Sequence, residues 1–75
     1  MKTFGERLAW YREERGWSQQ ELAEKAKVPY MTIYRLEANI YKDTRTFFAG
    51  KLARALGVSL DLLAGVYDDK ERIHG

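Results

Sequence analysis

Residues 18–38 decide the fold of this chain; they read SQQELAEKAKVPYMTIYRLEA. Ser18 followed three residues later by Glu21 is a capping box, which predicts a helix that opens at Ser18 and runs through Ala26. Pro29 suits the first turn of a second helix, which we expect to reach about Ala38, because its missing N–H costs nothing there. Only two or three residues separate the helices, so the chain must turn by roughly 90–120°.

A turn of this kind fixes which side chains face inward. Ala23 supplies the small residue that is needed where the helices cross, and Ile33 and Leu36 form the inward pair of the second helix. The remaining face of that helix must then point outward and carries Tyr30, Met31, Tyr34 and Arg35. Exposed aromatic and methionine side chains are unusual in a small domain. A helix presented in this way fits the major groove of DNA and reads base edges through its N-terminal residues.

The sequence before this stretch predicts one further helix. Thr3 and Glu6 form another capping box. Phe4, Leu8 and Tyr11 recur at helical spacing, and Gly16 stops the helix as a left-handed cap. We expect Trp17, directly after it, to lie in the core.

The sequence after residue 38 predicts a loop and two helices. Asn39 is a tolerable left-handed terminator, residues 40–45 are interpreted as a loop, and either Thr44 or Thr46 caps the fourth helix. The fourth helix ends at Gly57, and Ser59 caps a short final helix that ends at Gly65. The apolar positions of these two helices are Phe47 or Phe48, Leu52, Ala55, Leu56, Leu60, Leu62 and Leu63.

These signals predict an all-α fold, a compact bundle of five helices with short connections. Strand alternation is found nowhere in the sequence. We expect one domain over residues 1–65 and an acidic tail over residues 66–75 that frays, because it has little to bury.

Composition excludes several classes of protein. The 75 residues contain no cysteine, which rules out disulfides and thiolate metal sites. The longest uncharged run is too short to span a bilayer, and the N-terminus lacks the apolar run of a signal peptide, so we expect no membrane partner and a cytoplasmic location. His74 is the one histidine, and no cluster of carboxylates has metal-ligand spacing, so we expect neither an enzyme nor a cofactor, and no small-molecule ligand is evident.

Charge is distributed unevenly along the chain, although the net charge is only +2. Residues 25–54 contain seven bases against two acids, whereas residues 61–75 contain two bases against four acids. A basic middle favours a polyanionic partner, although an ordinary solvated surface would show the same pattern.

Four segments together resemble the phage repressor and Cro-type (Cro/C1) helix-turn-helix family, also called the xenobiotic-response-element family. The most specific parts are Ser18-Gln-x-Glu-Leu-Ala, Ile33-x-x-Leu-Glu37 and Leu52-Ala-x-Ala-Leu-Gly-Val-Ser59. The resemblance covers about residues 4–65. It implies a five-helix, lambda-repressor-like domain that binds double-stranded operator DNA as a homodimer on a palindromic site, most simply as a transcriptional repressor.

The resemblance also implies roles for individual residues. Tyr30, Met31 and Arg35 match base-reading positions, and Gln19 matches a glutamine that anchors a phosphate and braces the reading helix. Arg12 and Glu37 match a structural ion pair between the first and third helices. The further expected DNA contacts, mainly to phosphate or sugar, are Gln20, Thr32, Tyr34, Lys42 and Arg45. The expected dimer seam comprises Leu60, Leu62, Leu63, Val66 and Tyr67.

The chain departs from the family pattern at three points. Lys27 stands where the second helix usually ends in glycine, so a left-handed backbone there would store on the order of 1 kcal/mol of strain. Pro29 replaces the usual Ser/Thr cap of the third helix. The loop before the fourth helix is about two residues longer, which blurs the placement of Lys42 and Arg45.

Several alternatives stay open at the level of sequence. The chain is either a small regulator or the DNA-binding half of a larger one. A different function, as an antitoxin or another protein-interaction module, would keep the same fold. Of Phe47 and Phe48 only one can point inward, and Trp10 packs either on the tail or on a partner.

Overall fold

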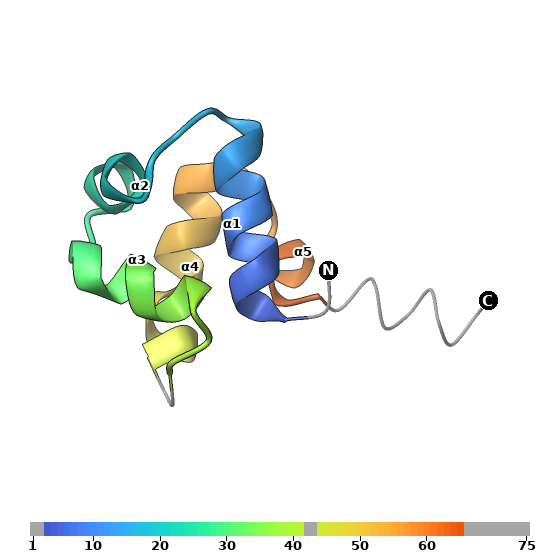
Figure 1. The fold of residues 1–75 in the computed structure, drawn as a ribbon. Coiled ribbons are helices and arrows are strands. Elements are labelled where there is room, and N and C mark those ends of the chain that lie inside the picture. The colour runs from blue at the N-terminus through green and yellow to red at the C-terminus, as the bar shows by residue number, and fades with distance from the viewer. Residues whose placement is uncertain (1–2, 42–43, 66–75) are drawn as a thin grey trace, which may run out of the picture.

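A computed structural model describes residues 3–41 and 44–65 of the chain. The described residues form five helices and no strand, which confirms the all-α prediction. The helices are α1 (Phe4–Glu14), α2 (Gln19–Ala26), α3 (Tyr30–Glu37), α4 (Thr44–Leu56) and α5 (Leu60–Ala64). Helix α4 packs against α2, α3 and α5, while α1 packs against α3 and α5, so that α2 and α5 lie at opposite sides of the molecule (Figure 1). No helix within these ranges is both long enough and apolar enough to cross a bilayer.

Capping residues set the helix starts. In α1 the Glu6 amide donates to Thr3 Oγ1 (3.1 Å) and the Thr3 amide donates to Glu6 Oε1 (3.0 Å). The same reciprocal pair forms between Ser18 and Glu21 at α2. At α5 the hydroxyl of Ser59 accepts from the Leu62 amide. Each bond satisfies a backbone donor that a helix N-terminus leaves unpaired, so all three predicted starts are confirmed.

Three predicted boundaries need correction. Pro29 is the extended residue before α3 (φ −62°, ψ 144°), not part of its first turn. Helix α4 begins at Thr44, so the loop is shorter than residues 40–45, and both Thr44 and Thr46 lie inside the helix rather than capping it. Arg45 is therefore a helical residue, not a loop residue. Lys42 and the acidic tail of residues 66–75, including Val66, Tyr67 and His74, lie outside the described residues.

The core draws side chains from all five helices. The largest fully buried side chains are Leu8, Leu22, Ile33, Leu36, Leu52 and Leu63. Burying a leucine or isoleucine contributes roughly 1.5–3 kcal/mol, so these residues supply much of the driving force for folding. Trp17 only borders this core instead of filling it, and the ammonium of Lys25 lies 4.9 Å from its ring centroid. Phe48 packs against the core, whereas Phe47 is 73% exposed.

Arg7 is a buried cation that the sequence did not lead us to expect. Its Nε donates to the carbonyl of Leu63 (2.8 Å) and its Nη2 donates to the carbonyl of Ala64 (2.9 Å). Both acceptors lie in the last turn of α5, where carbonyls lack intrahelical partners and the helix dipole favours a positive charge. Arg7 thereby fixes this short helix against α1.

Candidate nucleic-acid interface

The turn between α2 and α3 depends on a left-handed residue. Lys27 has φ 60° and ψ 47°, and the amide of Val28 donates to the carbonyl of Ala23 (3.0 Å) across the turn. The side chain of Val28 is buried against the core. This conformation normally favours glycine, because a Cβ crowds the following carbonyl. The left-handed conformation expected at Lys27, with its strain, is therefore present. This conformation redirects the chain into α3.

Helix α3 presents one polar-aromatic face outward and one aliphatic face inward. Tyr30, Met31 and Tyr34 are 43%, 45% and 47% exposed, whereas Ile33 and Leu36 are fully buried. Arg35 is also exposed, and Thr32 is half-buried beside it. Four candidate contact residues thus share the open face of one helix, and the fifth lies at its margin.

The N-terminus of α2 lies beside the end of α3. Gln19 is half-buried, and its Nε2 donates to Glu37 Oε1 (2.9 Å). This bond braces α3 and leaves the carbonyl oxygen and the second N–H of the amide for another partner. Gln20, the next residue, is exposed.

Arg12 and Glu37 form a forked ion pair under this surface. Arg12 Nε lies 2.6 Å from Glu37 Oε2, and Nη2 donates to Oε1 (3.0 Å). A third donor, Nη1, reaches the carbonyl of Trp17 (2.7 Å). The two side chains are only 13% and 8% exposed. The hydrogen bond to Glu37 raises the pKa of Arg12 above its ordinary value, so Arg12 remains charged at neutral pH and joins α1, the α1–α2 connection and α3.

Arg45 occupies the first turn of α4, where its guanidinium carbon lies 5.2 Å from the ring centroid of Tyr41 and 5.9 Å from that of Phe4. Cation–π contacts of this kind restrain the guanidinium group and leave N–H groups available to an acceptor. Arg45 is thus beside the N-terminus of α1 and not on the open face of α3.

Asn39 is a positioning residue whose role was not foreseen. Sequence reasoning identified it only as a helix terminator, and it does adopt the left-handed conformation (φ 61°). Its Oδ1 also accepts from the Gly5 amide (3.0 Å), and its Nδ2 donates to Thr3 Oγ1 (3.2 Å). Asn39 therefore links the end of α3 to the start of α1, across 34 and 36 residues of sequence where no local pattern signals a contact.

The described residues offer no site for a metal, since they contain no group of three His, Cys, Asp or Glu side chains arranged to hold one. The outward face of α3 carries the guanidinium of Arg35, and the side-chain amides of Gln19 and Gln20 lie at the start of α2. Such groups hydrogen-bond to phosphates and base edges.

Comparison with known proteins agrees with this geometry. A family model described as helix-turn-helix matches residues 8–63. The HTH-type transcriptional regulator SinR of Bacillus licheniformis is 36% identical over 67 residues, which cover 89% of this chain and 60% of that protein. SinR of Bacillus subtilis (strain 168) is 37% identical over 59 residues, which cover 79% of this chain and 53% of that protein. The chain thus matches little more than half the length of these relatives.

Proposed function

The chain belongs to the Cro/C1-type helix-turn-helix family of transcriptional regulators, and on this basis we propose that it is a sequence-specific repressor that reads a short pseudo-palindromic operator with α3 in the major groove. The observation that carries the proposal is the division of α3 into two faces. Ile33 and Leu36 hold the helix to the core, and the opposite face carries exposed side chains that reach base edges.

The proposed readout assigns bases to three residues. Tyr30 and Met31 lie in the first turn of α3, where a methionine meets the methyl group of a thymine by apolar contact. Arg35 lies one turn later, and arginine to guanine is the commonest specific contact in the major groove.

The remaining candidates hold the DNA backbone. Gln19 and Gln20 lie at the start of α2, whose N-terminal dipole favours phosphate. Thr32, Tyr34 and Arg45 are proposed to contact phosphate or sugar, and Lys42 is proposed to do so from the connection before α4. These contacts set the position of the domain and the salt dependence of binding, but not the sequence it prefers.

We further propose that two copies bind each operator, with the seam at α5. Leu60 and Leu62 are exposed, which suits a seam, whereas Leu63 is fully buried and is withdrawn from it. Two copies of one reading helix require half-sites about one helical turn apart, roughly 34 Å.

The test is a selection from randomised duplexes at low salt with the purified protein. We expect an enriched motif with two-fold symmetry and half-sites about 10 bp apart, centre to centre. If no motif is enriched while a tight heteromer co-purifies with the protein, the chain is an antitoxin or another protein-interaction module.

A further inference from the structure

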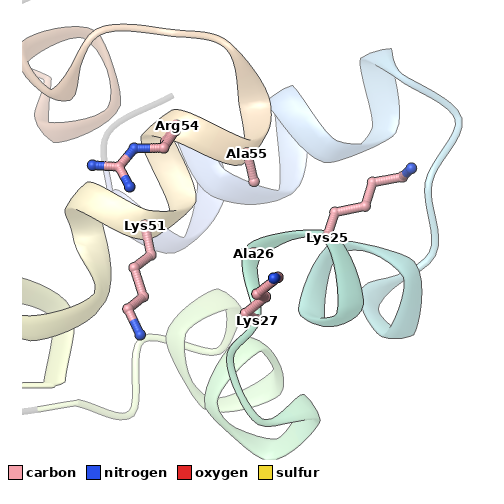
Figure 2. Close-up of a pocket in the computed structure, with 6 residues that line it drawn as sticks. All are labelled: Lys25, Ala26, Lys27, Lys51, Arg54 and Ala55. Carbon is pink, nitrogen blue, oxygen red and sulfur yellow. The ribbon is translucent and has the colours of Figure 1, made fainter.

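A basic cleft lies where the end of α2 meets α4, outside the proposed reading face. It has a volume of about 450 Å³ and is lined by Lys25, Ala26, Lys27, Lys51, Arg54 and Ala55. Figure 2 shows cations on both walls, two from the end of α2 and two from α4, with the small alanines between them. Four of the six lining residues are therefore cations, and none is an acid.

Three of these cations have neither a carboxylate nor an aromatic partner within the described ranges. No carboxylate there forms a salt bridge with Lys27, Lys51 or Arg54. Lys25 differs, because its ammonium lies over the ring of Trp17 and extends away from α4 (Figure 2). Lys27, Lys51 and Arg54 line one concave site, so they make it electropositive and favour a bound anion.

The cleft also lies close to the start of the reading helix. Lys27 precedes Tyr30, the first residue of α3, by three residues, a span of about 10 Å at most. With the N-terminus of α3 in a major groove, a lysine at that distance reaches the phosphates that border the groove. Lys27 thus carries a cation at a left-handed position where glycine would relax the backbone.

We propose that Lys27, Lys51 and Arg54 hold the phosphate backbone of the DNA that flanks the segment read by α3, so that the cleft lengthens the footprint without adding sequence information. This inference rests on the proposed function, since it requires α3 to lie in the major groove. Each lysine or arginine that neutralises a phosphate releases condensed counterions, which steepens the fall of affinity with salt.

The test compares two duplexes, the selected operator alone and the same operator with ten extra base pairs on each side. For the wild-type protein we expect the plot of log affinity against log salt to be steeper on the long duplex by about 2 to 3 units for each bound copy, since each of the three contacts contributes about 0.9. The variant Lys51→Gln/Arg54→Gln should lose about two of these units on the long duplex and none on the short one. Its base preference should not change.

Lys25→Gln is the control, because it removes a positive charge from the opposite wall of the same cleft, at a residue whose ammonium lies over the ring of Trp17. An equal loss of slope with Lys25→Gln would show a general effect of net charge and overturn the proposal. A lower melting temperature with unchanged slopes would do the same, since Arg54 would then merely complement the C-terminus of α4. Binding of poly-glutamate that requires Lys51 and Arg54, without any flank effect, would assign the cleft to an acidic polypeptide instead.

Failure of the proposed function is distinguishable from failure of this inference. In the first case the wild-type protein selects no operator at all. In the second it binds the operator with a slope that does not depend on duplex length.

Discussion

In the proposed complex, base discrimination depends most on Arg35. Its side chain is exposed, and its guanidinium can donate two hydrogen bonds to one guanine. Arg35→Ala should weaken operator binding by about 1–3 kcal/mol and relax the preference at one base pair of each half-site. Repeating the duplex selection with the variant measures both effects. Gln20→Ala serves as the comparison and should weaken all sequences alike. If Arg35→Ala also weakened binding to all sequences alike, Arg35 would contact phosphates instead of a base.

Lys27 is the residue at which the backbone is strained. A left-handed L-residue costs roughly 1–2 kcal/mol, and glycine at the same position avoids this cost while losing roughly 0.5–1 kcal/mol through chain entropy. We therefore expect Lys27→Gly to raise the free energy of unfolding by about 0.5–1 kcal/mol. Lys27→Ala keeps the Cβ and should leave stability near that of the wild type. Urea titrations in which both variants shift by the same amount would attribute the effect to charge and not to strain.

At the scale of elements, the Arg12–Glu37 pair is the joint between α1 and α3. Both side chains are nearly buried, so removal of one partner strands the charge of the other. Glu37→Met should lower the free energy of unfolding by about 3 kcal/mol and should also free Gln19. The double variant Arg12→Met/Glu37→Met should recover part of this loss, since no unpaired charge remains. Chemical denaturation of the three proteins measures the difference, and equal losses in the single and double variants would contradict it.

Helix α1 approaches the end of α3 closely at Gly5. A Cβ there would lie 2.5 Å from the carbonyl oxygen of Glu37 and 2.6 Å from that of Leu36, both of them backbone atoms. Gly5→Ala should therefore destabilise the fold by roughly 1–3 kcal/mol. Gly50→Ala is the control within α4, because its Cβ would meet nothing within 4 Å. It should stabilise the protein by about 0.5–1 kcal/mol, so thermal melts of the two variants should shift in opposite directions.

Contacts between elements mark the limit of what the sequence could predict, apart from the Arg12–Glu37 pair and the brace from Gln19, which only the family resemblance implied. Capping boxes and left-handed terminators are local signals, so the starts of α1, α2 and α5 and the turn at Lys27 followed directly from residue order. Gly5, Arg7 and Asn39 act across 30 residues or more, and no local pattern reports such contacts. The start of α4 was misplaced for a related reason. Threonine is common both in turns and as a helix cap, so the sequence did not distinguish Thr44 from Thr46 as the cap of this helix.

The candidate site shows the same division between local and long-range information. The outward face of α3 follows from helical periodicity once Ile33 and Leu36 are placed in the core. The bond from Gln19 to Glu37 has no such basis in spacing, because it joins the ends of two helices. Arg45 was assigned to a loop on the evidence of turn residues, and its aromatic partners Phe4 and Tyr41 come from other segments.

At the scale of the whole molecule, the proposed function requires two domains to combine on one operator. Leu60 is half exposed and borders a mainly apolar cleft of about 220 Å³ that is also lined by Phe4, Arg45, Thr46, Ala49 and Ala64. A side chain from a second copy entering this cleft would bury apolar surface, at about 25 cal/mol per Å². Because a single domain offers few such contacts, we expect pairing to be weak in solution and to be favoured when DNA holds two copies side by side.

Leu60→Ser should therefore reduce affinity for the complete palindrome by about tenfold or more, since 1.4 kcal/mol corresponds to a factor of ten, and leave affinity for an isolated half-site unchanged. Electrophoretic mobility-shift titrations on the palindrome and on the half-site measure the two affinities separately. Trp10→Ser is the control, because Trp10 is an equally exposed apolar side chain on α1. Equal losses on the palindrome and the half-site would place Leu60 in folding or DNA contact, and a loss with Trp10→Ser alone would move the seam to α1.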